Sequence, residues 1–131
     1  MVKKNTCVFI SGRGSNLNNL IKKSRDYNFP ISIKLVVSNN KNANGLFFAK
    51  KNSIPFLIIN TEKSNYESLI LLHLKKHKIS LICLAGYMKI LSKKFLNIYR
   101  KKIINIHPSL LPKFKGLNTF RRGIKKGEKK T

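Results

Sequence analysis

Two segments decide the fold of this chain, Leu81-Ile-Cys-Leu-Ala-Gly-Tyr-Met-Lys-Ile-Leu91 and Ile104-Asn-Ile-His-Pro-Ser-Leu-Leu-Pro-Lys-Phe-Lys-Gly-Leu117. Each begins with a short apolar run that is typical of a buried strand, and residues 92–99 between them predict a helix. A polar pair, Asn105 and His107, follows at the carboxyl end of the second strand. Chemistry in an open α/β sheet gathers outside the carboxyl ends of the strands, so this pair marks the candidate catalytic site.

The spacing of Asn105 and His107 indicates what the pair could do. Residues two apart in a strand lie on the same side of the sheet, so both side chains can converge on one reacting group. An amide donor beside an imidazole suits a carbonyl that becomes a tetrahedral oxyanion, which predicts an acyl-type transfer.

His73 and His77 lie four apart in another predicted helix, and we interpret them as structural or surface residues. No third ligand is near them in the sequence, so no metal site is expected.

The rest of the chain alternates short apolar runs with segments of helical spacing. We expect strands at residues 7–10, 31–37, 56–59, 81–85 and 102–106. We expect helices from residue 15 or 16, over 44–51, over 64–77 and over 92–99. Ser15 or Asn16 is the expected N-cap of the first helix, and Ser64 with Glu67 predicts a capping box for the third. This order predicts an α/β fold, an open parallel sheet with right-handed crossovers and helices on both faces.

Composition limits the function classes. The 131 residues allow one domain at most, and they contain 28 Lys and Arg against 4 acidic residues, a formal net charge of +24. Such a charge can indicate a polyanionic partner, but the lysines are scattered and neither an aromatic-basic motif nor a reader helix is evident, so nucleic acid is not favoured.

Cys7 and Cys83 lie in apolar runs and are expected to be buried free thiols. No signal peptide or membrane-length apolar run is present, so we expect a cytoplasmic protein with no membrane partner.

Two further segments have a functional and an ordinary interpretation. In Gly12-Arg-Gly-Ser-Asn16 two glycines let the backbone approach a ligand, and the following helix offers unpaired N–H groups to an anion. The segment lacks the third Gly of a dinucleotide fingerprint and the Lys of a P-loop, so an ordinary tight turn fits equally well. Met88-Lys-Ile-Leu91 is either a turn that caps the core or an apolar slot whose backbone binds a flat heterocycle.

Four segments, FISGRGSNLNNLI, VVSNNKNANGL, LAGYMKIL and NIHPSLLPKFKGLNT, resemble the phosphoribosylglycinamide formyltransferase family of purine synthesis. The resemblance runs from residue 7 to the end of the chain, with all four motifs in the expected order and spacing. It implies a Rossmann-like formyltransferase fold. It also implies transfer of the formyl group of the cosubstrate 10-formyltetrahydrofolate to the amine of glycinamide ribonucleotide, without a metal.

The resemblance also implies roles for individual residues. Asn105 would stabilise the oxyanion and contact the folate, and His107 would act as a proton donor or electrostatic partner. Lys63 matches a basic folate-contacting position. The phosphate end of the substrate would be bound by Gly12, Arg13, Gly14, Ser15 and Asn16, and the pterin ring by the backbone of Met88, Lys89, Ile90 and Leu91.

The sequence departs from the family pattern in one respect. The family has a third catalytic residue, an aspartate downstream of the histidine, and none of the four acids in residues 1–131 occupies that position. We therefore expect a single, incomplete formyltransferase-fold domain that is truncated at its carboxyl end and lacks the final strands and the aspartate loop. Losing an acid that orients a catalytic histidine can cost several orders of magnitude in rate, so we expect little or no turnover by these residues alone. An unfinished sheet edge also invites a homodimer.

Two alternatives remain open. A methionyl-tRNA formyltransferase or a formyltetrahydrofolate hydrolase shares the Asn and His pair, and the basic charge would suit tRNA. The Gly-Arg-Gly-Ser-Asn turn and the Gly-Leu-Asn-Thr that follows the Pro-Lys loop favour the glycinamide enzyme. The second alternative is a non-catalytic module that binds phosphate ligands or nucleic acid, which the charge of the chain supports.

Overall fold

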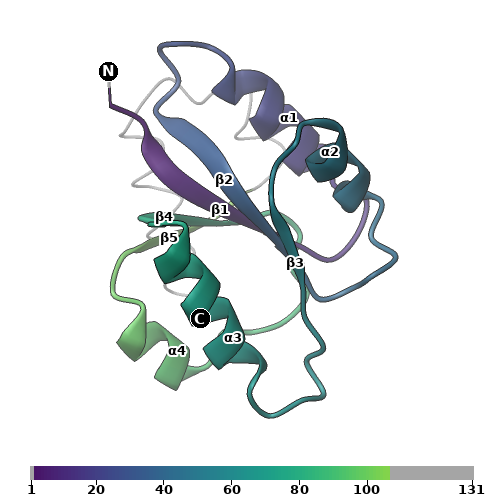
Figure 1. Ribbon diagram of the computed structural model, residues 1–131, viewed down its shortest axis with the longest axis vertical. Helices are drawn as coiled ribbons and strands as arrows, with labels where there is room; N and C mark the ends of the chain where they lie inside the picture. Colours follow the sequence, from purple (N-terminus) through teal and green to yellow (C-terminus); the bar gives the residue numbers. More distant parts are fainter. Residues whose placement is uncertain (1, 107–131) are drawn as a thin grey trace.

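The computed structural model describes residues 2–106, which form a five-stranded parallel sheet between two layers of helices (Figure 1). The strand order is β3-β2-β1-β4-β5. The strands are β1 (Lys4–Ile10), β2 (Ile31–Ser38), β3 (Phe56–Ile58), β4 (Leu81–Leu84) and β5 (Lys102–Asn105). The helices are α1 (Ser15–Ser24), α2 (Gly45–Lys51), α3 (Tyr66–Lys76) and α4 (Lys93–Ile98). The predicted α/β fold is confirmed.

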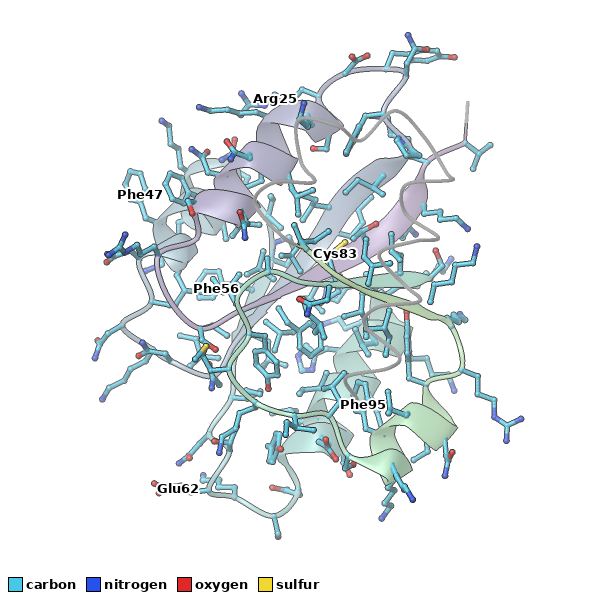
Figure 2. All side chains as sticks on the ribbon, turned by 180° about the vertical axis from the view of Figure 1, so that it is seen from behind. Arg25, Phe47, Phe56, Glu62, Cys83 and Phe95 are labelled. Carbon is cyan, nitrogen blue, oxygen red and sulfur yellow. The ribbon has the colours of Figure 1, made fainter. Side chains whose placement is uncertain are left out.

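The central strands β1 and β4 are buried on both faces, which is why each is a continuous apolar run in the sequence. Their side chains alternate between two core clusters. Val8 and Ile10 pack in the cluster under α1 and α2, whereas Cys7 and Phe9 pack in the cluster under α3 and α4. Figure 2 shows Cys83 among the side chains in the middle of the molecule. Cys7 and Cys83 are both buried free thiols, as predicted, and burial raises the pKa of each.

Two of the predicted helix caps are wrong. Helix α1 begins at Ser15 as expected, but its N-cap is Gly14 and no side chain caps it. Helix α3 begins at Tyr66 with Asn65 as its N-cap and no side-chain cap, so Ser64 and Glu67 do not form a capping box. Glu67 instead accepts hydrogen bonds from Ser92, so its carboxylate is committed to another element. The expected start of α4 is confirmed, because the Ser92 side chain accepts from the Phe95 N–H.

The order in which strands are added to the sheet switches between β1 and β4. The chain first adds β2 and β3 on one side of β1, and then adds β4 and β5 on its other side. Helix α1 leads from β1 to β2 on one side, and α3 leads from β3 at the edge back to β4 on the other side of β1. The loop after β1 therefore rises toward one layer of helices, while the loop after β4 leads to α4 in the opposite layer (Figure 1). Such a switch point opens a crevice at the carboxyl ends of the strands, which is where ligands bind in this kind of sheet.

Candidate functional site

Three loops meet at the carboxyl ends of the central strands, and Ser11 joins them. Ser11 follows β1 directly, and its hydroxyl donates to Asn39 Oδ1 at 2.6 Å, in the loop after β2. The same oxygen accepts the N–H of Met88, in the loop after β4, at 2.8 Å. The two predicted ligand segments, which begin at Gly12 and at Met88, are thus brought together by one half-buried hydroxyl.

The glycine-rich segment turns tightly because Gly14 adopts a left-handed conformation with φ of 76°. It lies against Gly45 at the start of α2, where the Gly45 N–H donates to Gly12 O at 3.1 Å. A Cβ added to Gly14 would be 2.2 Å from the Gly45 Cα, so both the backbone angle and the space at Gly14 require glycine. Gly12 and Arg13 are exposed in front of the N-terminus of α1, whose first N–H groups have no partner within the helix. The segment therefore has the geometry of an anion site.

The segment after β4 divides into exposed and buried parts. Gly86 has a φ of 77°, and the side chains of Met88 and Ile90 are 79% and 77% exposed. Leu91 is only 3% exposed and packs in the core under α3 and α4. The Met88 N–H is already bonded to Ser11, whereas the backbone groups of residues 89–91 make no hydrogen bond within residues 2–106.

The remaining candidates lie at the same edge of the sheet. Asn105 is the last residue of β5, half-buried, and is in register with Leu84 at the end of β4. Alternation places its side chain on the same face as Ile103, which packs in the core under α3 and α4. Lys63 is exposed in the loop between β3 and α3, with β2 and β1 lying between β3 and β4. His107 lies outside the described residues, so its position beside Asn105 stays a prediction.

Sequence reasoning missed Ser11 and Asn39. Both residues follow directly on buried strand residues, so a search for polar residues at predicted strand ends would have flagged them. It would not have paired them with Met88, because that pairing depends on the strand order. The sequence pattern predicts strands but does not state which strands are neighbours.

A comparison with protein families matches the formyl transferase family over residues 4–131. The chain belongs to this family. The phosphoribosylglycinamide formyltransferase of Haemophilus influenzae is 43% identical to this chain over an alignment of 129 positions, which covers 95% of the chain and 61% of that relative. The human trifunctional purine biosynthetic protein adenosine-3 is 40% identical over 95% of the chain and 13% of its own length.

Solved structures agree with this assignment. The crystal structure of phosphoribosylglycinamide formyltransferase from Brucella melitensis superposes on this chain with a TM-score of 0.75 at 39% identity. The superposition covers 95% of the chain and 67% of that structure. The chain thus spans about three fifths of the Haemophilus relative and two thirds of the Brucella structure. The predicted Rossmann-like formyltransferase fold is confirmed.

Two features of residues 2–106 concern metal binding and membranes. Within this range His, Cys, Asp and Glu side chains form no group of three or more that could hold a metal ion. The rings of His73 in α3 and of His77, the C-cap of that helix, stack with their centroids 6.5 Å apart. No helix in the described range is both long and apolar enough to cross a membrane.

Proposed function

We propose that this chain carries the ribonucleotide- and folate-binding residues of a phosphoribosylglycinamide formyltransferase, in one formyltransferase-fold domain. The reaction would transfer the formyl group of 10-formyltetrahydrofolate to the amine of glycinamide ribonucleotide. The observation that carries the proposal is the meeting of the glycine-rich loop and the loop after β4 at the switch point, one strand away from Asn105. Relatives with this name at up to 43% identity support it.

The glycine-rich loop, Gly12, Arg13, Gly14, Ser15 and Asn16, would bind the phosphate of the ribonucleotide. The N-terminus of the ten-residue α1 offers backbone N–H groups and a partial positive charge. The exposed Arg13 guanidinium would add a planar pair of donors for phosphate oxygens. No metal is required in this arrangement, because the helix and the arginine already offset the charge of the phosphate.

The segment from Met88 to Leu91 would hold the pterin ring of the folate. The Met88 N–H is used by Ser11, so the backbone groups of Lys89, Ile90 and Leu91 would make the hydrogen bonds to the ring. The exposed Met88 and Ile90 side chains would be covered when the ring binds, which stabilises the complex by about 25 cal/mol for each Å² of apolar surface removed from water. Lys63 would meet the acidic tail of the folate.

Asn105 and His107 would carry the chemistry. The amine nitrogen of the ribonucleotide attacks the formyl carbon, and the carbonyl oxygen takes the negative charge of a tetrahedral intermediate. The Asn105 amide would donate to that oxygen, a contribution of ~3–4 kcal/mol for a preorganised donor. The bond between the formyl carbon and N10 of the folate then breaks. The attacking nitrogen loses one proton to water, and a protonated His107 would supply the proton that N10 gains.

A thermal-shift titration with two probes tests the proposal. Glycinamide ribonucleotide and the unreactive 5-formyltetrahydrofolate should each raise the unfolding temperature, with stabilisation of about 2.7 kcal/mol at a hundredfold excess over the dissociation constant. Methionyl-tRNA serves as the control acceptor. Protection by methionyl-tRNA without protection by the ribonucleotide would favour the tRNA-modifying alternative, and protection by neither small molecule would contradict the proposed site.

A further inference from the structure

Ser11 occupies an unusual position between the two proposed ligand loops. It directly precedes the phosphate loop, residues 12–16, and its hydroxyl oxygen accepts the Met88 N–H at the start of the pterin segment, residues 88–91. Met88 is 77 residues further along the chain, so the bond joins segments that nothing in the local sequence connects. The Ser11 hydroxyl therefore links the two loops directly.

The geometry of this hydroxyl is fixed from the side of β2. Ser11 donates its proton to Asn39 Oδ1 at 2.6 Å, which leaves an oxygen lone pair for the Met88 N–H. The backbone on either side is held as well, because Asn40 Nδ2 donates to Ser11 O at 3.2 Å and the Gly45 N–H donates to Gly12 O at 3.1 Å. Ser11 thus has one oriented acceptor for Met88 on an otherwise anchored backbone.

We propose that Ser11 is a positioning residue that couples the two binding loops, so that ribonucleotide and folate each strengthen the binding of the other. This inference rests on the proposed function, because it assigns the two ligands to the two loops. A phosphate bound to residues 12–16 would restrict the motion of the adjoining Ser11, and through the Ser11 hydroxyl that of the Met88 N–H and the backbone that follows it. The second ligand then has less backbone to order. Such coupling is reciprocal by thermodynamic linkage.

The coupling is measured as a ratio of dissociation constants. We expect saturating glycinamide ribonucleotide to lower the dissociation constant of 5-formyltetrahydrofolate by about fivefold or more in the natural chain, as titration calorimetry would record. Ser11→Ala should bring this ratio to within about twofold of one, while Ser11→Thr, which keeps a hydroxyl, should restore it. Asn39→Ala, which leaves both loops unchanged in sequence, should lower the ratio by freeing the Ser11 proton.

Ser80→Ala is the matched control. The Ser80 hydroxyl, like that of Ser11, bonds a backbone group of another strand or loop, here Asn5 O at 3.5 Å, but Ser80 lies at the amino end of β4, away from the two loops. The Ser80 variant should keep the full ratio. Binding of both probes without coupling, or a full ratio in Ser11→Ala, would overturn the inference and leave the proposed function intact. Binding of neither probe by the natural chain would instead overturn the proposed function. If Ser11→Ala does not fold, the ratio in Asn39→Ala decides.

Discussion

At the scale of single residues, the hydroxyl of Tyr87 is the feature with the clearest consequence for stability. Within residues 2–106 it is buried without a hydrogen-bond partner, while its ring packs edge-on against Phe9 with centroids 5.2 Å apart. Burial raises the pKa of this phenol above its ordinary value. Tyr87→Phe keeps the ring contact and removes the unpaired hydroxyl. We expect the free energy of unfolding to rise by about 1 kcal/mol, measured by urea denaturation.

Tyr99→Phe is the control for this change. Tyr99 is also buried in the core under α3 and α4, but its hydroxyl donates to Lys102 O at 3.2 Å. The same removal of one oxygen should therefore lower the unfolding free energy by about 1 kcal/mol, because a paired hydroxyl is lost. If both variants lose stability equally, the Tyr87 hydroxyl has a partner, such as a bound water, and the argument fails.

At the scale of the elements, α4 depends on its contacts, since six residues are too few to form a stable helix alone. Ser92 accepts from the Phe95 N–H at 3.1 Å and also bonds Glu67 of α3 through its hydroxyl and its N–H. Ser92→Ala removes both the cap and the side-chain link. We expect a loss of about 1–2 kcal/mol in the free energy of unfolding, together with faster hydrogen exchange at the Phe95 amide.

Glu67→Ala separates the two contributions. This variant removes both hydrogen bonds between Ser92 and α3 but leaves the Ser92 oxygen free to cap Phe95, so exchange at the Phe95 amide should stay slower than in Ser92→Ala. Suppose that the two variants lose equal stability and that exchange at the Phe95 amide is unchanged in Ser92→Ala. The cap would then contribute nothing, and the contact between the two helices would account for the whole loss.

The elements also show how far the sequence alone could lead. Buried strands such as β4 are recognisable because their apolar runs come from burial on both faces. Strand β1 begins at Lys4, three residues before the predicted start. The apolar pattern did not include Lys4 and Asn5 because they are polar, and they belong to the strand because they pair with β2. The capping box failed for a similar reason. Its local pattern was correct, but the Glu67 carboxylate is taken by Ser92, 25 residues away.

The same limit applies to the candidate site. The glycine-rich turn and Asn105 could be placed at strand ends because the turn follows a recognisable strand and Asn105 is the last residue of another. The link from Asn39 through Ser11 to Met88 could not, because it requires β2, β1 and β4 to be neighbours in that order. Contacts between strands depend on topology, so the residues that join the loops emerge only from the fold.

At the scale of the whole molecule, the formal net charge of +24 opposes folding. With 28 basic and 4 acidic residues, one-to-one ion pairs can neutralise only 4 of the cations, and folding brings the others closer together. Salt screens this repulsion, since the Debye length falls from about 30 Å at 0.01 M to about 3 Å at 1 M. We therefore expect the unfolding temperature to rise as sodium chloride is increased from about 0.01 M to about 0.5 M, as measured by calorimetry.

Ligand binding should respond to salt differently from stability. A nucleic acid that contacts 6–10 basic residues would lose roughly a thousandfold or more in affinity between 50 mM and 200 mM salt, because it releases many counterions. A ribonucleotide bound through one phosphate at α1 releases few counterions, so its affinity should fall far less over the same range of salt. An unfolding temperature that falls with salt would contradict the repulsion argument. A steep loss of ribonucleotide affinity would mean that diffuse charge, rather than the ordered loop at Gly12, holds the phosphate.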